Sequence, residues 1–457
     1  MADESPLRRH AETIWRAGVR AVDSGRLIRE AVRRRGSVLT IDGETIDLGS
    51  IGRVAVVGGG KAGAGMAAAL EDVLGPDLVA EKVTGWVNVP ADCLRPTHAI
   101  HLHSARPAGV NEPIAAGVAG SEQILRIVSD LGEDDLCVVL LSGGGSALLP
   151  APADNITLDD KLRVTRLLMG SGATIHELNC VRKHLSRIKG GGLARACRAG
   201  RRVSLIISDV IGDRLDVIAS GPTVVDSSTA ADALAVLRKY AGTPDDIPAV
   251  VRQLLERPQG VSSTIESNGD RARRLDMHNV IIGNNATALH AAAETAAELG
   301  YSVQSLGSEN NGEARDVGRE LAQRCLAIRQ ASSAADAPVC LLSGGEPVVH
   351  LVPTDRPRKG GRNQELVLAG LIRLRDAGLK RIVLLSGGTD GEDGPTDAAG
   401  AIADQSVLDR AKSLRLNPGE FLAINNSYPF FDQTGGLLRT GPTHTNVMDL
   451  RVAIVAE

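Results

Sequence analysis

The chain has 457 residues, which is more than one ordinary hydrophobic core takes up and enough for two or three domains. Apolar residues make up 43% of it and charged residues 23%, the balance of a soluble globular protein. With a net charge of −4 and only 2% aromatic residues, the composition argues against a nucleic-acid partner and against binding to an anionic membrane.

Residues 6–35 predict a helix or a pair of helices, because apolar residues recur there at spacings of three and four. Farther along, short β-rich runs alternate with Ala- and Leu-rich helical stretches. The clearest runs are Arg53–Val57, Thr84–Val89, Leu136–Leu141, Val203–Ser208, Asn279–Ile282, Val303–Leu306, Val339–Leu342, Val348–Val352 and Arg381–Leu385. Several are apolar along their whole length, as parallel strands covered on both faces are. The alternation predicts an α/β fold with βαβ units and a mostly parallel, doubly wound sheet.

The second half of the chain predicts a mixed sheet. Val339–Leu342 and Val348–Val352 are separated only by SGGEP and look like a hairpin. The polar segment 241–274, which contains Pro, Gly and Ser and a short expected helix at 249–256, separates two series of strands. We therefore expect one domain over residues 1–245 and a smaller one over 246–457, whose last strand is able to pack back on the first domain. A loop is expected at 332–338.

The cysteines indicate a reducing compartment. All six are scattered without a C-x-x-C pair, and Cys137 and Cys340 stand inside apolar runs. Reduced cytosolic thiols are used in this way, so we expect no disulfide and no zinc site. Because residues 1–15 have no apolar signal-peptide core and no stretch reaches membrane-spanning length, the expected location is the cytoplasm.

Three apolar runs end in similar sequences: VVLLSGGGS (138–146), VCLLSGGEP (339–347) and IVLLSGGTD (382–390). The repeat is too short for a solenoid. Glycine just beyond the carboxyl end of a strand opens the crevice where α/β proteins bind ligands. The three loops therefore predict one large anion-binding cleft or two facing ones, and a glycine triplet favours a nest of backbone N–H groups at Ser142–Ser146.

A further glycine motif lies at 54–70, where VAVVGGGKAGAGMAAAL runs from a buried strand into a helix of small residues. Backbone N–H groups at the helix start and the charge of Lys61 favour a phosphate contact. Gly58, Gly60 and Gly63 also match the dinucleotide fingerprint, although Glu81 precedes the next strand instead of ending it. A turn that only packs helix against sheet is the third interpretation. The motif is not a Walker A.

Two further segments carry charges that could serve such a site. The run NCVRKHLSRIKGGGL (179–193) clusters Arg182, Lys183, His184, Arg187 and Lys189, which alone is more typical of a solvated helix face. In LIISDVIGDRLDVIASGPT (205–223), Asp209 follows a buried strand directly and is placed to bind Mg²⁺ or to orient a hydroxyl. For Asp213 and Asp216, loop capping is the favoured interpretation.

The last three motifs lie in the second half. In KGGRNQE (359–365), Arg362 is placed at the start of an expected helix. Its guanidinium could bind a phosphate or carboxylate through two hydrogen bonds, or remain solvated. In SGGTDGEDGPTDAAG (386–400), the acidic side chains could ligate a metal or form capped turns; they are Asp390, Glu392, Asp393 and Asp397. For Thr443, His444, Thr445 and Asn446, ordinary loop hydrogen bonding is favoured.

Together these motifs resemble the class II D-glycerate 2-kinase family, whose C-terminal region is called the MOFRL domain. The matching segments, in order, are GGGKAGAGMA, LLSGGGSALL, RKHLSRIKGGGLA, SDVIGDRLDVIASGPT, SGGEP, GGRNQE, SGGTDGEDGPTDAAGA and GPTHTNVMDL. The resemblance implies transfer of the γ-phosphoryl group of ATP to the 2-hydroxyl of D-glycerate. It also implies two α/β domains, the first Rossmann-like, with the active site in the cleft between them.

By motif, the family's catalytic lysine falls on Lys61 and its arginine on Arg362, and both are expected in a solvated cleft. Asp209, then Asp390, would serve Mg²⁺ or the substrate hydroxyl. The candidate cofactor-binding residues are Gly59, Gly60, Ser142, Gly143, Gly144, Gly145, Ser146, Ser343, Gly344, Gly345, Glu346 and Asp390. The alternatives are an NAD(P)H-dependent hydroxypyruvate reductase and a non-catalytic sugar-phosphate sensor. A homodimer is compatible with all three.

Overall fold

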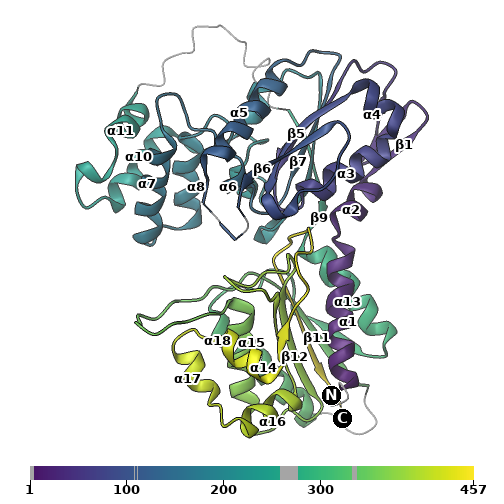
Figure 1. Cartoon of the computed structure of the whole chain (residues 1–457), viewed down its shortest axis with the longest axis vertical. Coiled ribbons are helices and arrows are strands. Elements are labelled where there is room, and N and C mark those ends of the chain that lie inside the picture. The colour runs from purple at the N-terminus through teal and green to yellow at the C-terminus, as the bar shows by residue number, and fades with distance from the viewer. Residues whose placement is uncertain (1–4, 108, 111, 258–275, 332–336, 457) are drawn as a thin grey trace. The chain divides into compact units, whose positions relative to one another are not determined.

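The structure is a computed structural model that describes residues 5–107, 109–110, 112–257, 276–331 and 337–456 (Figure 1). Its contacts divide the chain into two compact units, which we describe one at a time. The larger unit is Ser24–Ile282, and the smaller unit combines Met1–Asp23 with Gly283–Glu457. This division differs from the boundary expected at 245, because the first helix packs with the second half of the chain and the strand near 280 completes the first sheet.

The larger unit contains α2 (Ser24–Ala31), β1 (Val32–Arg35), β2 (Val38–Ile41), β3 (Glu44–Asp47), β4 (Val54–Gly59), α3 (Gly63–Leu74), α4 (Pro76–Lys82), β5 (Val83–Pro90), β6 (Ile100–Arg106), α5 (Ala115–Ser129), β7 (Leu136–Leu141), α6 (Gly145–Leu148), α7 (Leu158–Gly170), α8 (Ile175–His184), α9 (Gly192–Ala196), β8 (Arg201–Ile207), α10 (Ala230–Tyr240), α11 (Ala249–Glu256) and β9 (His278–Gly283). The helix expected at 249–256 is thus confirmed. Part of the segment 241–274, and most of the loop expected at 332–338, lie outside the described residues.

The main sheet of the larger unit has the strand order β6-β5-β4-β7-β8-β9. Each pairing from β6 to β8 is parallel, and β4 and β7 are buried along their whole length. Counted from β4, this is the order of the doubly wound dinucleotide-binding folds, which reverses between β4 and β7. Ligands bind such sheets at that switch point, outside the carboxyl ends of the strands.

Helices and a side cluster surround this sheet. Ile124 of α5 and Leu193 of α9 pack on the face that carries Val57 and Val139. Helices α7, α8, α10 and α11 form a separate apolar cluster, built from residues such as Val164, Leu178, Leu234 and Val251 and seen beside the sheet in Figure 1. This helical cluster supplies charged side chains to the site described below.

The segment after α2 differs from the prediction. The predicted pair of helices is confirmed by α1 (Pro6–Ala21) and α2, but residues 32–35 form β1 of a three-stranded antiparallel sheet with β2 and β3. Gly36 and Gly43 sit in its two turns at φ values of 61° and 80°, which glycine adopts without strain. The run of three arginines hid the strand, because it gives neither an apolar stripe nor a clear alternation.

The smaller unit contains α1, α13 (Asn285–Glu298), β10 (Ser302–Ser305), α14 (Ala314–Ala331), β11 (Val339–Gly345), α15 (Arg362–Leu374), β12 (Ile382–Gly388), β13 (Gly400–Ala403), α16 (Gln405–Ser413), α17 (Pro418–Ala423), α18 (Ser427–Thr434), β14 (Leu437–Leu438) and β15 (Asp449–Val455). Its strands are ordered β10-β11-β15-β12-β13-β14. β10 and β11 are parallel, whereas β15 is antiparallel to both of its neighbours, which confirms the mixed sheet.

Two predictions for this unit were wrong. Residues 348–352 are not a strand; Val348 makes only an isolated bridge with Glu313, so there is no hairpin with β11 in the described chain. The last strand does not pack back on the first sheet, because β15 lies in the centre of the smaller unit's own sheet. Its buried pattern, apolar on both faces, suits that central place.

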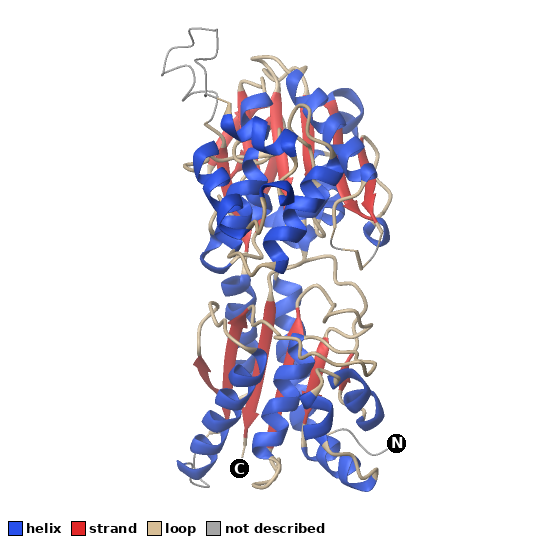
Figure 2. Ribbon diagram, turned by 90° about the vertical axis from the view of Figure 1, so that its left-hand side faces the viewer, coloured by secondary structure: helices blue, strands red, loops and turns tan. Residues whose placement is uncertain are grey.

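Helices cover both faces of this sheet (Figure 2). Leu342 and Val452 face Trp15 of α1 and Ala292 of α13, whereas neighbouring strand residues face α14 and α15. Among the described residues, no helix combines the length and hydropathy needed to cross a membrane.

Candidate active site

In the larger unit, the loops after β4 and β7 lie side by side at the switch point. The amide of Lys61 donates to the carbonyl of Gly143 at 2.8 Å, and the amide of Ala62 donates to Oγ of Ser142 at 3.0 Å. The two glycine motifs that were separate in the sequence therefore form one structure at the carboxyl ends of neighbouring strands.

The glycines of the first motif are required by this close packing. A Cβ at Gly58 would lie 2.0 Å from the carbonyl oxygen of Leu140, and one at Gly60 would lie 2.0 Å from Oγ of Ser142. A Cβ at Gly63 would lie 2.9 Å from Val87. Contact between strands and helix thus accounts for all three glycines of the dinucleotide-like pattern without a dinucleotide.

The two loops differ in the amides that they offer. The amide of Gly60 donates to the carbonyl of Asn88 at 3.1 Å, so it is engaged like those of Lys61 and Ala62. In the described part of the chain, by contrast, the amides of Gly143, Gly144 and Ser146 have no acceptor. Gly144 has a φ of 78°, the left-handed conformation found in anion-binding nests. The nest expected from the glycine triplet therefore has amides to offer, whereas the loop before α3 offers chiefly the side chain of Lys61.

The side chains of two basic residues, Lys61 and Arg106, lie beside Gly144. A Cβ at Gly144 would lie 3.6 Å from Cγ of Lys61 and 3.7 Å from Nη2 of Arg106. Arg106, at the end of β6, is only 2% exposed and donates to the carbonyl of Val110. The sequence interpretation did not identify Arg106, whose only signal is an arginine at a strand end that follows a run of His and Ser.

Behind the nest, Ser146 is held by a strained segment. Its hydroxyl lies 3.0 Å from that of Ser220, which donates to Oδ1 of Asn179 at 3.1 Å. Ala219, Ser220 and Gly221 all have positive φ values, of 50°, 63° and 63°. Strained backbone of this kind occurs where surrounding structure holds a functional site in place.

The charged run 179–193 is not a solvated helix face throughout. Lys183 is buried and its Nζ lies 3.2 Å from Oδ1 of Asp226, and the side chain of Lys189 is buried and donates to the carbonyl of Ser146 at 2.9 Å. Arg187 alone fits the solvated interpretation, being exposed and paired with Glu122. The sequence favoured a solvated helix face for this run taken alone, so the burial of Lys183 and Lys189 was not predicted.

The three aspartates after β8 have different surroundings. Asp209 is half-buried just beyond the strand, as expected. Asp216 accepts hydrogen bonds from Nε and Nη2 of Arg214 at 3.2 and 3.0 Å, which agrees with a structural role. Asp213 has a φ of 52° in a tight turn beside Gly212.

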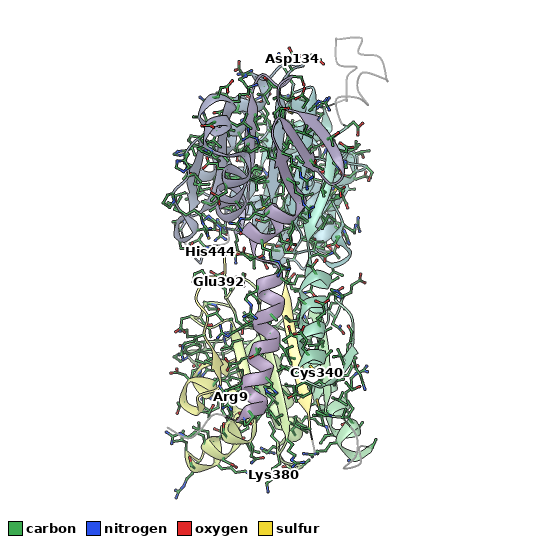
Figure 3. All side chains as sticks on the ribbon, turned by 90° about the vertical axis from the view of Figure 1, so that its right-hand side faces the viewer. Arg9, Asp134, Cys340, Lys380, Glu392 and His444 are labelled. Carbon is green, nitrogen blue, oxygen red and sulfur yellow. The ribbon has the colours of Figure 1, made fainter. Side chains whose placement is uncertain are left out.

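In the smaller unit, the two SGG segments flank one carboxylate. Ser343–Gly345 ends β11, Ser386–Gly388 ends β12, and β15 begins between them, so that Asp449 pairs in register with both Gly345 and Gly388. Figure 3 places Glu392 and His444 at this end of the unit, opposite Lys380. Antiparallel β15 thus starts where its neighbours end, and Asp449 lies wholly buried between their glycines.

Arg362, the first residue of α15, binds this carboxylate through two of its nitrogens. Its Nε and Nη2 donate to the two oxygens of Asp449 at 2.7 and 3.0 Å, and Nη1 donates to Glu346 at 2.8 Å. Burial lowers the pKa of Arg362, but the charge and hydrogen bonds of Asp449 outweigh burial and the net shift is upward. Burial raises the pKa of Glu346. Arg362 is a third exposed, so it is less solvated than expected and is a permanently charged group held in one orientation.

A second arginine stiffens the first SGG segment. Arg451 of β15 is 1% exposed and donates to the hydroxyl of Ser343 and the carbonyls of Gly344 and Gly345, at 3.1 to 3.2 Å. Burial lowers its pKa to about 10. Asp449 and Arg451 were both missed by the sequence interpretation, because an apolar strand gives no sign of where its charged residues point.

The acidic loop after β12 mainly forms caps. The carboxylate of buried Asp393 accepts from the amides of Asn363 and Gln364, at 3.0 and 2.8 Å, and so caps the N-terminus of α15. Asp397 accepts from Tyr428 and from Arg439. Burial raises the pKa of Asp393 to about 7. Of the four acids, half-buried Asp390 remains the candidate ligand, and its Oδ1 accepts from the amide of Glu392 at 3.0 Å.

The polar residues before β15 make loop hydrogen bonds, as favoured. Thr443 donates through Oγ1 to the carbonyl of Thr389, and Thr445 donates to the carbonyl of Val22. Asn446 accepts from the amide of Met448. This loop is thereby fixed against the end of β12.

The carboxylates of the two units suit a magnesium ion only if the substrate supplies the remaining ligands. In the described ranges, no group of three or more His, Cys, Asp or Glu side chains is placed to hold a metal. Asp209 and Asp390 are half-buried carboxylates at the ends of strands. Mg²⁺ is commonly bound through one or two carboxylates together with substrate phosphates, and such an ion fits either residue.

Comparison with known proteins covers nearly the whole chain. Residues 10–256 match the model of a domain of unknown function, DUF4147, and residues 339–449 match the MOFRL family. The chain is 36% identical to a D-glycerate 2-kinase of Thermotoga maritima, with all of both chains covered. A solved glycerate kinase structure from Thermotoga maritima has a TM-score of 0.80 at 34% identity, with 98% of this chain and 99% of that chain covered.

One relative has a different name. A protein of Agrobacterium vitis, provisionally named a hydroxypyruvate reductase, is 41% identical over 88% of this chain and 87% of its own. It covers less of the chain than the kinase does. With a DUF4147 model over its first half, a MOFRL model near its end and a full-length D-glycerate 2-kinase relative, the chain belongs to the MOFRL-containing glycerate kinase family.

Proposed function

We propose that this protein is a glycerate 2-kinase that transfers the γ-phosphoryl group of ATP to the 2-hydroxyl of D-glycerate. The observation that carries the proposal lies at the switch point of the larger unit's sheet. There Lys61 lies beside a left-handed glycine nest whose amides, at Gly143, Gly144 and Ser146, have no acceptor among the described residues. Phosphoryl transfer needs such positioning and positive charge more than covalent help.

In the reaction, the oxygen on C2 of glycerate forms a bond to the γ-phosphorus while the bond from that phosphorus to the β,γ-bridging oxygen breaks. The products are 2-phosphoglycerate and ADP. The hydroxyl proton passes to a carboxylate, for which Asp209 is the first candidate and Asp390 the second. Magnesium bound with the nucleotide would neutralise phosphate charge, and the carboxylate not used as a base would be its protein ligand.

Lys61 and Arg362 are proposed to stabilise the charge that develops on the transferred group. Lys61 provides an ammonium group beside the nest, and Arg362 has its orientation fixed by Asp449 and is partly exposed. Preorganised cations of this kind do not have to reorient as the transition state forms. Gly59 and Gly60 would contribute through the close approach that they allow, since the amide of Gly60 is engaged. Ser343, Gly344, Gly345, Glu346 and Asp390 remain proposed nucleotide contacts.

The reductase is the second candidate, supported by the name of one relative. Against it, Gly58, Gly60 and Gly63 are explained by packing, and Glu81 lies in α4 before β5 begins. One assay separates the candidates: the full chain is given glycerate, ATP and Mg²⁺, or hydroxypyruvate and NADH. ADP and 2-phosphoglycerate are expected. NADH oxidation without ADP would establish the reductase, and the 3-phospho isomer alone would overturn the position of transfer.

A further inference from the structure

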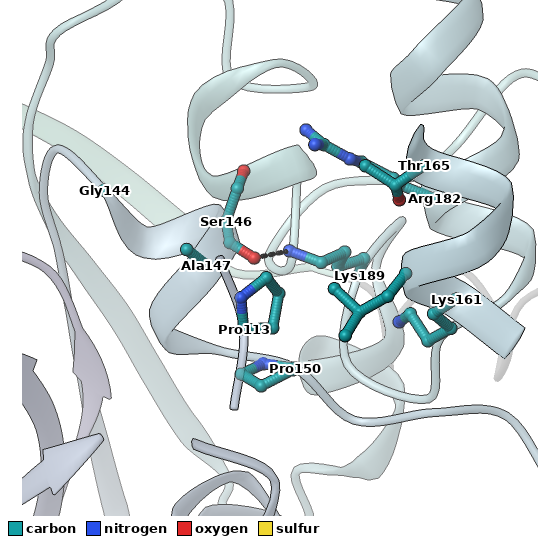
Figure 4. A pocket seen from close by; sticks show the side chains of 10 residues that line it. Pro113, Gly144, Ser146, Ala147, Pro150, Lys161, Thr165, Arg182 and Lys189 are labelled. Atoms are coloured by element: carbon teal, nitrogen blue, oxygen red, sulfur yellow. Dashed lines mark hydrogen bonds between the residues drawn. The ribbon is translucent and has the colours of Figure 1, made fainter. Parts of the chain in front are cut away.

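A separate pocket of the larger unit lies beyond the nest, with a volume of about 220 Å³ (Figure 4). Three basic side chains enter it from different elements: Lys161 from α7, Arg182 from α8 and Lys189 from the loop after α8. Gly144 and Ser146 form the side toward the switch point. The helical cluster and the glycine nest thus meet around one cavity.

The three cations have little to balance them. Lys189 is 3% exposed, and its ammonium donates only to carbonyls, those of Ser146 at 2.9 Å and Ala219 at 3.4 Å. Lys161 is 8% exposed, and its Nζ has no hydrogen-bond partner in the described part of the chain. A buried ammonium without a partner costs far more free energy than a paired one. A ligand that brings negative charge into the pocket would offset this cost.

The electrostatics of the pocket point in the same direction. Burial, then Arg182, lowers the pKa of Lys161 to about 7; burial and the two other cations lower the pKa of Lys189. No carboxylate of the described chain contributes to either shift. Lys161 also stands near the N-terminus of α7, where the helix dipole favours anions over cations. All these costs fall when an anion enters.

The size and walls of the pocket select among anions. A cavity of about 150 Å³ is known to hold benzene, so a pocket of about 220 Å³ has room for a three-carbon acid. Pro113, Ala147, Pro150 and Leu162 give the pocket apolar walls, which suit a short carbon chain better than a hydrated polyphosphate. Thr165, which also lines the pocket, adds a hydroxyl that suits an alcohol group.

We propose that Lys161, Arg182 and Lys189 form the carboxylate-binding subsite of the acid substrate. That the acid is glycerate rests on the proposed function. The carboxylate lies among the three cations, and the carbon chain extends along the apolar wall toward Ser146 and Gly144. The pocket thereby selects a small hydroxy acid before the nucleotide takes part.

The test is a calorimetric titration of the full chain with D-glycerate in the absence of nucleotide. Lys161→Met is expected to weaken binding about tenfold or more, the loss of one charge-assisted hydrogen bond. Lys161→Arg should retain part of the affinity. Arg166→Met is the matched control, because Arg166 lies on the same helix but pairs with Glu112 at the surface; its affinity should stay within about twofold.

A melting curve of each variant shows whether weaker binding results from loss of folding. Lys161→Met should melt no lower than the wild type, since it removes an unpartnered buried charge. Should it unfold, Arg182→Met, whose side chain is less buried, takes its place. A titration with inorganic triphosphate tests whether the pocket binds polyphosphate in place of a carboxylate.

The outcomes separate the two proposals. Unchanged glycerate affinity in Lys161→Met, or lost triphosphate affinity in its place, overturns the carboxylate subsite while leaving the kinase untouched. Binding of another small hydroxy acid but not glycerate, abolished by Lys161→Met, upholds the subsite and overturns glycerate as the substrate. A wild type that binds no small acid overturns the subsite.

Discussion

Asp449 fixes the guanidinium of Arg362 through both of its carboxylate oxygens, at 2.7 and 3.0 Å, although the two residues are 87 positions apart. The carboxylate is wholly buried at the start of β15, and the arginine begins α15. Because the pair joins the central strand to the helix that carries the arginine, its two members contribute both to stability and to the proposed chemistry.

Removing the arginine alone is therefore expected to destabilise the smaller unit. Arg362→Met leaves Asp449 buried without its partner, which costs about 3–5 kcal/mol when a buried pair is broken. The double variant Arg362→Met, Asp449→Asn should recover much of this free energy of unfolding, because no uncompensated charge remains. Turnover should stay low in both, by about 10²-fold. Denaturant unfolding and steady-state assays measure the two effects, and a double variant that regains turnover would assign Arg362 a structural role only.

Lys61 gives a second prediction, because it lies in the loop between β4 and α3 and not at the start of a helix like Arg362. Lys61→Met is expected to lower kcat by about 10²-fold, as when a charge aimed at the transition state is lost, with little change in melting temperature. Exposed Lys380, in the smaller unit, supplies the control Lys380→Met, which should keep normal kinetics. Near-normal turnover in Lys61→Met would remove the lysine from the proposed chemistry.

The contact between the β4 and β7 loops predicts a contrast between two glycines. In Gly60→Ala, the added Cβ would lie 2.0 Å from Oγ of Ser142 and 2.7 Å from its carbonyl, so the nest must shift. We expect overpacking to cost about 1–3 kcal/mol and turnover to be lost. Gly170 ends α7, and a Cβ added there would have no neighbour within 4 Å among the described residues. Gly170→Ala should therefore be neutral or stabilising by about 0.5–1 kcal/mol. Equal melting temperatures for both variants would contradict the close contact.

Much of the larger unit could be predicted from sequence, because its central strands are continuously apolar and end in glycines. Runs such as Leu136–Leu141 fixed the strands, and the loops that follow them lie where the strand order predicts a ligand crevice. The arginine-rich strand β1 could not be found, since its hydrogen bonds rather than its side chains define it. The false hairpin at 348–352 arose because a short run rich in Val and Leu looks like a strand, although this run forms no strand in the described part of the chain.

The site was predicted less completely than the fold. Ser142–Ser146 and Lys61 carried local signals of glycine and charge at strand ends. Asp449, Arg106 and Lys161 carry no such signal: each is one charged residue within an ordinary strand or helix, and only tertiary packing shows that it is buried. Charge burial is a property of the fold, so sequence patterns alone do not reveal it.

The last prediction concerns pH and the lysine pocket. Burial, and then Arg182, lowers the pKa of Lys161 to about 7, and the charged groups facing it are cations, Arg182 on α8 and Lys189 in the loop after it. A bound carboxylate favours the protonated amine and raises that pKa. Below pH 7 the free protein already carries the charge, whereas above it binding must take up a proton. The KM for glycerate should therefore rise with pH above about 7, by up to about tenfold per unit, while the KM for ATP follows no such trend.

The same shift has an effect on stability with a definite sign. Between pH 7 and the ordinary lysine pKa of 10.5, the unfolded chain holds a proton that folded Lys161 has lost, so the contribution of Lys161 to stability rises with pH over this interval. Lys161→Met removes this dependence. The free energy of unfolding of the wild type should accordingly approach that of the variant as pH increases from 7 to 10, measured by urea denaturation at each pH. In Lys161→Met the glycerate KM should also lose its inflection near pH 7. If the inflection persists unchanged in the variant, another group controls substrate binding, and Lys161 is not the residue that titrates.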